Sequence, residues 1–305
     1  VGVSRACSMS QAAVHDAYHE VESKWRAVRD YESVLRAPLA SEDWVAELLW
    51  DPCTDPRCIR LDVASEAYRV CGDVDEDVFL LPAAAGLAEQ AHLLAAILEE
   101  WALPPNRSNL WSGDTETDEA ALALRNALTS FRCGESLDQE NLSVVERLRW
   151  VTLGQQYDWA SRTYWQGSLS LPDALAKCAE AALCQLGPAA ACMGHGNFQA
   201  AICNFYHAAR RPSDRLGGHR DDVEPDTVSP LVTISLGLPC IFLLGKETRS
   251  TRPTPILLRG GSMLVLAKRA RQAYHGVPTV LVPPKLQLRG RAPRKMAEPA
   301  TEFPG

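Results

Sequence analysis

The sequence lacks several features that would assign it to particular classes of protein. No run of 18 apolar residues occurs among its 305 residues, so we expect no membrane span. No hydrophobic signal segment follows Val1, and a start at Val rather than Met is compatible with a piece of a longer protein. No internal repeat is visible, and the length indicates one large domain or two ordinary ones. We expect a monomer inside the cell, in the nucleus, the cytoplasm or a mitochondrion.

The ten cysteines also lack a recognisable pattern, because none of them forms a C-x-x-C pair and their spacings are irregular. Several lie within apolar runs, such as Cys203 in Ala-Ile-Cys-Asn and Cys240 in Leu-Pro-Cys-Ile-Phe. A disulfide framework is therefore not expected. We interpret the cysteines as buried, reduced thiols of an intracellular protein.

The net charge of −7 hides an uneven distribution of charge along the chain. Residues 1–150 carry 13 Lys and Arg against 27 Asp and Glu, a net −14, whereas residues 151–305 carry 18 against 11, a net +7. A basic half is compatible with a polyanionic partner such as nucleic acid. The alternative interpretation is that the excess charge is ordinary solvated surface.

The spacing of apolar residues predicts an α+β fold. Helical spacing occurs over 10–36, 87–101 and 172–187, and a further helical piece near 118–132 lies in a polar, acidic stretch. Apolar stretches bounded by Gly and Pro predict strands, and they cover 78–81, 149–154, 198–206, 231–244, 254–258, 262–267 and 273–282. We predict helices packed on one side of a β-sandwich or jelly roll, a fold that holds metals in its mouth.

One short stretch carries the pattern of a metal site. In Gly218-His219-Arg220-Asp221 the His and the Asp are two residues apart, so in an extended segment they share one face. His275 can supply a third ligand from another strand. Two His and one carboxylate form the facial triad of non-haem Fe(II) enzymes. A His-x-Asp pair often occurs by chance, so the surrounding sequence has to decide whether this pair is a metal site.

Those surroundings resemble a known family. The stretches that carry the resemblance are Leu148 to Gly154 followed by Tyr157-Asp158-Trp159, then Asn204-Phe205-Tyr206, then Gly218 to Asp221 followed by Pro230 to Gly237, and finally Ile241 to Gly245, Leu257 to Leu266 and Arg271 to His275. As an ordered set covering 148–282, they resemble the AlkB family of Fe(II)/2-oxoglutarate dioxygenases, most closely its AlkB homologue 1 branch.

The resemblance implies a fold, domain boundaries and cofactors. It implies a double-stranded β-helix (jelly-roll) core with flanking helices, in which residues 76–292 form the dioxygenase domain with an acidic insert near 112–141. Residues 1–75 are then a helical N-terminal extension and 293–305 a disordered tail. The implied cofactors are Fe(II) and 2-oxoglutarate, and His219, Asp221 and His275 are the implied catalytic metal ligands.

The resemblance also implies where 2-oxoglutarate binds. Asn204 and Tyr206 match the family's Asn-x-Tyr strand and would face the cosubstrate, although a capping Asn and a core Tyr are the alternatives. The family ends in Arg-x-Asn-x-Thr-x-Arg, whose two Arg hold the carboxylates. Here the only stretch with that spacing runs from Lys285 to Arg291. Lys offers a point charge instead of a planar fork, so we expect weaker binding, with Lys285 or Arg291 closing the pocket.

Substrate contacts are expected from aromatic and basic residues. Tyr157 and Trp159 match the substrate lid and would stack a flipped or single-stranded base, with core aromatics as the alternative. Lys246, Arg249 and Arg252 lie on the turn after Gly245 and would contact phosphate, unless they belong to a solvated loop.

The function implied by the resemblance is oxidative demethylation of N-methylated bases in DNA, tRNA or both. Val223 stands four residues after the first ligand, where some relatives carry an acid that reads the base, so the base is not identified. One alternative is a protein or small-molecule hydroxylase with the same core. Another is a catalytically impaired nucleic-acid-binding module that has lost capture of the cosubstrate.

Overall fold

The computed structural model describes residues 15–28, 34, 48–49, 51–61, 66–70, 76–111, 119–132, 139–158, 161–165, 169–193, 197–224 and 226–283. Trp159, Lys285, Arg291 and the predicted tail 293–305 lie outside the described residues. The predicted domain boundaries stay predictions, but the segment 1–75 is not helical throughout, because it contains the strands Cys58–Arg60 and Tyr68–Val70.

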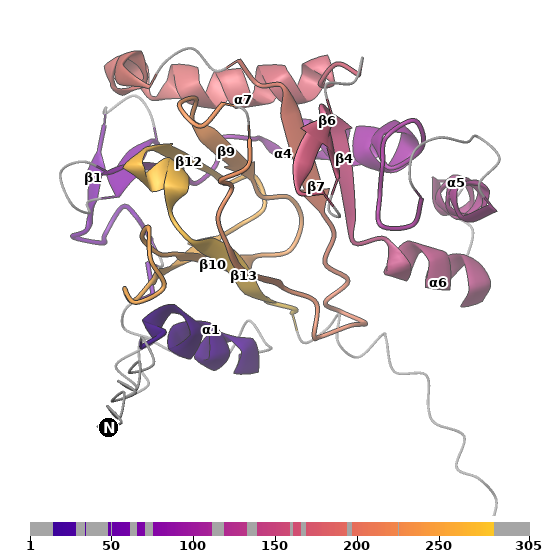
Figure 1. The fold of residues 1–305 in the computed structure, drawn as a ribbon, viewed down its shortest axis with the longest axis horizontal. Helices are drawn as coiled ribbons and strands as arrows, with labels where there is room; N and C mark the ends of the chain where they lie inside the picture. Colours follow the sequence, from indigo (N-terminus) through magenta and orange to yellow (C-terminus); the bar gives the residue numbers. More distant parts are fainter. Residues whose placement is uncertain are drawn as a thin grey trace, which may run out of the picture.

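Two antiparallel sheets face each other (Figure 1). The five-stranded sheet has the order β1 (Cys58–Arg60), β2 (Tyr68–Val70), β3 (Glu76–Leu81), β12 (Met263–Lys268) and β9 (Leu231–Ile234). The four-stranded sheet has the order β11 (Thr254–Leu258), β10 (Cys240–Leu244), β13 (His275–Val280) and β8 (Leu216–His219). Strands far apart in the sequence are therefore neighbours, as in the pairing of β3 with β12.

The strands in the middle of the sheets are apolar at successive positions, because both faces of each sheet are covered. In β12, Leu264 and Leu266 belong to the core between the sheets, whereas Met263 and Val265 belong to the core on the other face. Successive residues of a strand point to opposite faces, so a strand covered on both sides is apolar throughout. In β10, likewise, Phe242 points between the sheets while its neighbours point outward.

Helices cover both outer faces of this sandwich. The five-stranded sheet packs against a group of helices that comprises α4 (Leu87–Ala96), its π-helical continuation η2 (Ile97–Trp101), α5 (Glu119–Arg132), α6 (Gln139–Arg147), α7 (Asp173–Gln185) and η3 (Gly187–Cys192). On the opposite side, α1 (Ala17–Ala27) packs against the four-stranded sheet through Tyr18, Val21 and Trp25 (Figure 1). The prediction of helices on one side only is therefore wrong, because α1 has its own apolar stripe.

Two small sheets complete the fold. β4 (Trp150–Gly154) pairs with β7 (Ala200–Asn204), and β5 (Gln156–Asp158) forms a hairpin with β6 (Thr163–Trp165). Within the described part of the chain, β7 has β4 as its only strand partner and β9 is an edge of its sheet.

Most predicted elements are present. The predicted strand over 231–244 is two strands, because Gly237 has a φ of +82° and the chain turns there. Among the described residues no helix is long and apolar enough to cross a membrane. Cys53, Cys58, Cys178, Cys184, Cys203 and Cys240 are free thiols, as expected, but Cys53 and Cys184 are exposed, so burial is wrong for these two.

Candidate active site

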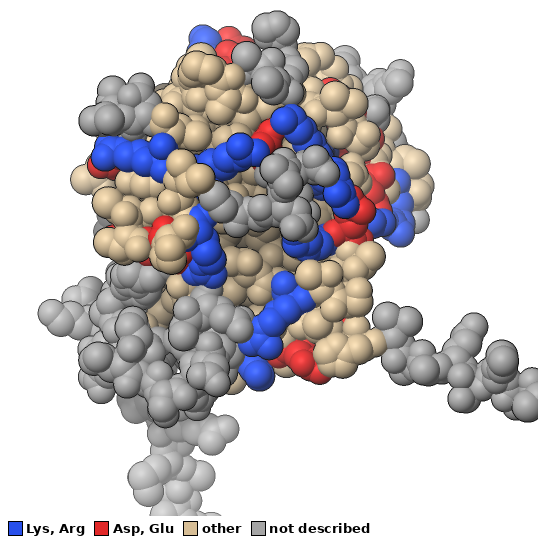
Figure 2. All heavy atoms as spheres, turned by 90° about the vertical axis from the view of Figure 1, so that its left-hand side faces the viewer, with Lys and Arg blue, Asp and Glu red and all other residues tan. Residues whose placement is uncertain are grey.

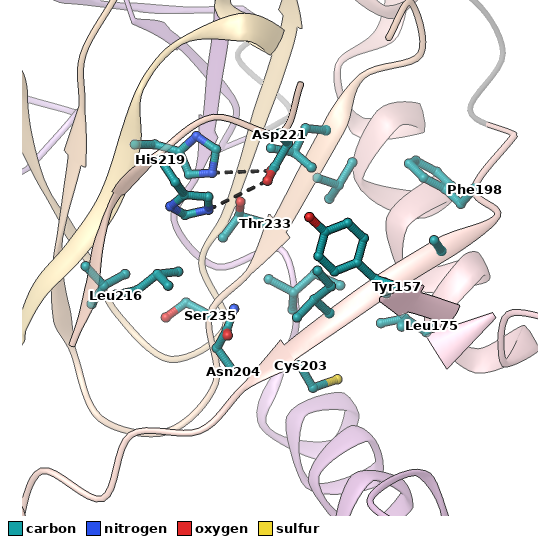
Figure 3. Close-up of a pocket in the computed structure, with 18 of the residues that line it drawn as sticks. Tyr157, Leu175, Phe198, Cys203, Asn204, Leu216, His219, Asp221, Thr233 and Ser235 are labelled. Atoms are coloured by element: carbon teal, nitrogen blue, oxygen red, sulfur yellow. Dashed lines mark ion pairs between the residues drawn. The ribbon is translucent and has the colours of Figure 1, made fainter. Parts of the chain in front are cut away.

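Three side chains with metal-ligating atoms converge at one end of β8 and β13. His219 and His275 are direct partners in the pairing of these strands, and their ring centroids are 4.4 Å apart. Asp221 follows β8, with its carboxylate 3.6 Å from Nε2 of His219 and 3.4 Å from Nε2 of His275 (Figure 3). One ligand atom from each residue lies within 4.8 Å of the others. Close approach of the three residues, expected from the sequence, is therefore observed.

Hydrogen bonds fix the orientation of both imidazole rings. Nδ1 of His219 is 3.0 Å from the carbonyl of Gly217, and Nδ1 of His275 is 3.0 Å from the carbonyl of Ala273. A carbonyl only accepts, so in the neutral form of each ring the proton lies on Nδ1 and the Nε2 lone pair faces Asp221. Phe242 stacks on His275, with centroids 5.7 Å apart and planes 12° apart. Both Nε2 atoms are thus oriented to act as metal ligands.

The electrostatics of the three residues favour metal binding. Burial raises the pKa of Asp221, but the hydrogen bond and charge of His275, with smaller contributions from His219 and Arg271, lower the pKa below its ordinary value overall. Burial, together with the neighbouring His275, lowers the pKa of His219. The carboxylate is therefore ionised and His219 neutral at neutral pH, which are the forms that bind a metal.

A buried arginine supports Asp221 from behind. Nη1 of Arg271 donates to the Asp221 carbonyl at 2.8 Å, and Nη2 lies 3.2 Å from the Glu224 carboxylate. Glu224 also accepts from the hydroxyl of Tyr164 at 3.2 Å. Burial, along with the charge of Glu224, raises the pKa of Tyr164, which stays a neutral donor. This chain of contacts joins the β5–β6 hairpin to the segment that carries Asp221.

The triad opens into a cavity of about 820 Å³. β7 and β9 supply other parts of its wall, including Asn204 of β7 and, just beyond it, Tyr206. Thr233 and Ser235 line it from β9 and the residue following that strand (Figure 3). Burial raises the pKa of Tyr206, so its hydroxyl is a neutral donor. Asn204 and Tyr206 thus share the cavity with the triad, as the sequence led us to expect.

The β5–β6 hairpin contributes aromatic residues to the same cavity. Tyr157 is buried, lines the cavity, and points its hydroxyl toward the triad (Figure 3). Its ring centroid lies 5.0 Å from that of Tyr164. Arg162, on the hairpin turn, lies 3.9 Å from Asp222, a second contact between the hairpin and the metal segment.

The residues predicted to contact phosphate lie outside the cavity wall, unlike the other described site residues. Lys246, Arg249 and Arg252 do not belong to the cavity wall, whereas Arg162 and Arg271 do. The Nε of Arg249 donates to Asp16 at 2.8 Å, so this guanidinium contacts α1 instead of facing a ligand. The sequence could not show this, because Asp16 is more than 200 positions away.

Glu224, Tyr164 and Arg162 are site residues that sequence reasoning missed. Their signal was present: Tyr164 stands in the polar aromatic stretch after β4, and Glu224 follows Val223, the position at which an acid was considered. A hairpin pairing Tyr157 with Tyr164 was needed to bring these side chains together.

Comparisons with known proteins agree with this donor set. The family model of the 2OG-Fe(II) oxygenase superfamily matches residues 110–296, more than half of the chain. This chain belongs to the 2OG-Fe(II) oxygenase superfamily. Its cofactors are accordingly Fe(II) and 2-oxoglutarate.

Individual relatives narrow this class. The chain is 31% identical over 250 residues to the DNA N(6)-methyladenine demethylase ALKBH1A of Arabidopsis thaliana, covering 74% of this chain and 70% of that protein. It is 33% identical to the tRNA demethylase abh1 of Schizosaccharomyces pombe, covering 59% and 55%. It is 31% identical to the nucleic acid dioxygenase ALKBH1 of Homo sapiens, covering 64% and 48%. The chain thus spans about half the length of the yeast and human proteins. Within the superfamily it falls in the AlkB family, near these ALKBH1 relatives.

Proposed function

We propose that this protein removes N-methyl groups from bases of DNA or tRNA by Fe(II)- and 2-oxoglutarate-dependent oxidation. The observation that carries the proposal is the His-Asp-His triad in the wall of a cavity that also contains Tyr157, an aromatic side chain able to stack a base. The relatives named for demethylation of DNA and tRNA support the choice of substrate.

The donor set fits Fe(II). His219 and His275 supply two neutral imidazole nitrogens and Asp221 supplies one carboxylate oxygen, the combination typical of non-haem Fe(II) oxygenases. When bound, Fe(II) and 2-oxoglutarate supply the oxidising chemistry: O2 hydroxylates the methyl group, and formaldehyde, succinate and CO2 are released. Arg271 and the two backbone carbonyls that accept from Nδ1 keep these three ligands in place.

For 2-oxoglutarate we propose Asn204 and Tyr206 as hydrogen-bond donors, with Lys285 or Arg291 as the cation opposite the far carboxylate. The last two lie outside the described residues. Support comes from β7 and β9, which both line the cavity and each have, among the described strands, one edge without a strand partner. Two such edges can accept an extended segment through main-chain hydrogen bonds. Residues 284–292 directly follow the last described residue, Pro283.

For nucleic acid we propose Tyr157 and Trp159 as stacking residues and Lys246 and Arg252 as phosphate contacts, joined by Arg162 at the hairpin. Arg249 is assigned to α1 instead, on the contacts given above. Basic side chains outnumber acidic ones on the face shown in Figure 2. Phosphate contacts release counterions, so affinity for an oligonucleotide is expected to fall steeply with salt.

The finer features of the protein are part of the same proposal. We propose that the two facing sheets form a double-stranded β-helix, within a dioxygenase domain over 76–292. We also propose a monomer that works where nucleic acid and reducing conditions meet, in the nucleus, the cytoplasm or a mitochondrion. Light scattering on a size-exclusion column tests the monomer, which would have a mass of 33.4 kDa.

One experiment tests the function directly. The protein is incubated with Fe(II), 2-oxoglutarate, O2 and a panel of single-stranded DNA and tRNA oligonucleotides carrying different N-methylated bases, and formaldehyde and succinate are measured. We expect both products in equal amounts with at least one substrate. Oligonucleotide binding without either product would support the non-catalytic binding module instead.

A further inference from the structure

The strand that carries His219 is an edge strand, and α1 covers that edge. β8 is the last strand of the four-stranded sheet, so its outer polar groups have no strand to pair with in the described sheet. Exposed edges of this kind are normally covered or occupied in native proteins. Here the cover consists of side chains from α1 and from the turn after β10, and these reach the residue directly before the first metal ligand.

Both backbone polar groups of Gly218 are bound by this cover. The Gly218 N–H donates to the carboxylate of Glu22 at 3.2 Å, and the Gly218 carbonyl accepts from Nη1 of Arg249 at 3.2 Å. That carbonyl belongs to the peptide joining Gly218 to His219. Arg249 therefore holds the peptide that joins Gly218 to His219, and Glu22 holds the peptide directly before it; together they fix the position from which the His219 side chain starts.

The two side chains that hold Gly218 are themselves fixed. The Glu22 side chain is only 3% exposed and is paired with Arg26 at 2.8 Å. Arg249 donates to Asp16 at 2.8 Å and lies over the ring of Tyr18, 5.1 Å from its centroid. Hydrogen bonds to charged groups are stronger than those between neutral groups. The contacts of Glu22 and Arg249 with Gly218 therefore restrict the position of β8.

Gly218 has no room for a side chain on the α1 side. A Cβ atom built there would lie 2.3 Å from Cε1 of Tyr18, far inside van der Waals contact. Tyr18 is fully buried and cannot swing away freely. Residues alternate along the segment, so His219 and Asp221 face the cavity on one side while Gly218 meets α1 on the other.

We propose that Tyr18, Glu22 and Arg249, called here the α1 buttress, set the affinity of the site for its metal by positioning His219 through Gly218. Glu22 and Arg249 are positioning residues and not ligands. The inference rests on the proposed metal site. It gives the N-terminal helix a role in the chemistry of a triad that lies some 200 residues later in the sequence.

The test measures metal affinity instead of turnover. Co(II) is titrated into the full chain by calorimetry and visible absorption, well below the melting temperature of every variant. Glu22→Gln keeps the shape of the side chain but removes the charge. We expect it to weaken Co(II) binding by roughly 10-fold, the lower end of the range seen when partners of metal ligands are removed. Glu20→Gln is the matched control, because Glu20 lies on the exposed side of the same helix and pairs with His15.

Two further pairs of variants keep the test decisive if Glu22→Gln folds poorly. Gly218→Ala is expected to weaken Co(II) binding, and adding Tyr18→Leu, which makes room for the new methyl group, should restore part of the affinity. Arg249→Lys should fall between wild type and Arg249→Met. If wild type binds no Co(II), the proposed metal site fails. If wild type binds but Glu22→Gln or Gly218→Ala binds equally well, the α1 buttress is only structural and the inference is overturned.

Discussion

The two walls of the cavity are built in different ways. The triad wall is formed by β8, β13 and the segment through Glu224. Hydrogen bonds and strand pairing hold each of its three ligand residues in place, so we call it the braced wall. His275 pairs with His219 in register, both Nδ1 atoms donate to carbonyls, and Arg271 binds the backbone of Asp221. The other wall, formed by β7 and β9, consists of two strands that each have one edge without a strand partner in the described part of the chain.

This difference in how the walls are held indicates that one wall determines metal affinity and the other determines binding of 2-oxoglutarate. A braced wall preorganises ligands and loses metal affinity when a brace is removed. A wall of open edges can adapt to a cosubstrate or to an added strand, so changes there should affect 2-oxoglutarate instead. The two walls should therefore respond separately to substitution, and the predictions below test that separation from the largest expected effect to the smallest.

Asp221→Ala should remove the metal site while leaving nucleic-acid binding in place. The change deletes the only carboxylate of the triad. Loss of a ligand should exceed the roughly 10–100-fold loss of affinity caused by loss of a ligand's partner. We expect formaldehyde release to fall to background and Co(II) binding to weaken by more than about 100-fold, with oligonucleotide affinity within about 2-fold of wild type.

Asp222→Ala is the control for that variant. Asp222 is the next residue but is exposed and pairs with Arg220. Demethylation that persists in Asp221→Ala, or Co(II) affinity that is lost equally in Asp222→Ala, would contradict the assignment of the ligands.

Tyr206→Phe should affect the β7–β9 wall alone. It removes one hydroxyl donor that we assign to a carboxylate of 2-oxoglutarate. Hydrogen bonds to charged groups contribute about 1.5–3 kcal/mol, and each 1.4 kcal/mol corresponds to roughly tenfold, so the KM for 2-oxoglutarate should rise by about 10-fold or more. Co(II) affinity should not change. Tyr68→Phe is the matched control, because Tyr68 is buried in β2 away from the cavity. A fall in Co(II) affinity with an unchanged KM would show that the two walls are not separate.

Tyr157→Ala should weaken oligonucleotide binding without affecting either wall. Stacking of a base on an aromatic ring contributes about 1–3 kcal/mol, so we expect roughly 10-fold lower affinity by fluorescence anisotropy. Tyr157→Phe should bind like wild type, since the ring is retained. Decarboxylation of 2-oxoglutarate in the absence of nucleic acid should be unchanged in both variants. Equal affinities of the Ala and Phe variants would remove Tyr157 from the proposed substrate contacts.

The triad wall was largely predictable from the sequence, and the reason is physical. His219 and Asp221 follow the two-residue period of an extended chain, and apolar runs ending in Gly or Pro marked β10, β12 and β13. Local periodicity therefore predicted both the strands and the shared face of two ligands. The sequence offered His275 as the third ligand from another strand, and the resemblance to a family strengthened the choice of all three residues.

What could not be predicted depends on contacts between distant residues. Arg249 is on a turn after Gly245 that reads as solvated, yet its partner Asp16 is the N-cap of α1. Glu224 and Tyr164 meet because the β5–β6 hairpin folds over the metal segment. No local pattern encodes such pairs, because each side chain alone is an ordinary polar surface residue.

The smallest expected effects concern two thiols that line the cavity, and the first is a loss of stability at high pH. Burial raises the pKa of Cys203, on β7, and of Cys240, on β10, to about 12 each. Because the folded-state pKa lies above the unfolded value, the contribution of each thiol to stability is complete below pH ~9, the ordinary thiol value. It is lost as pH rises toward the folded pKa. The melting temperature of wild type should therefore fall between these limits, and less steeply in Cys203→Ala or Cys240→Ala.

The same two thiols compare the two sides of the cavity, because Cys203 lies on β7 and Cys240 lies on β10, the strand paired with β13 of the triad wall. Reaction with iodoacetamide requires the thiolate, and local opening of the structure increases access to the partly buried Cys203 and to the buried Cys240. If the β7–β9 wall opens more readily than the braced wall, Cys203 should be modified faster than Cys240 at pH 8, by roughly 10-fold for a difference of 1.4 kcal/mol in opening. Addition of 2-oxoglutarate and Co(II) should slow Cys203 more than Cys240, because the ligand then holds the open wall. Exposed Cys53 is the control for intrinsic reactivity. Equal rates for the two cavity thiols, with and without ligand, would mean that the walls are equally rigid and that the comparison fails.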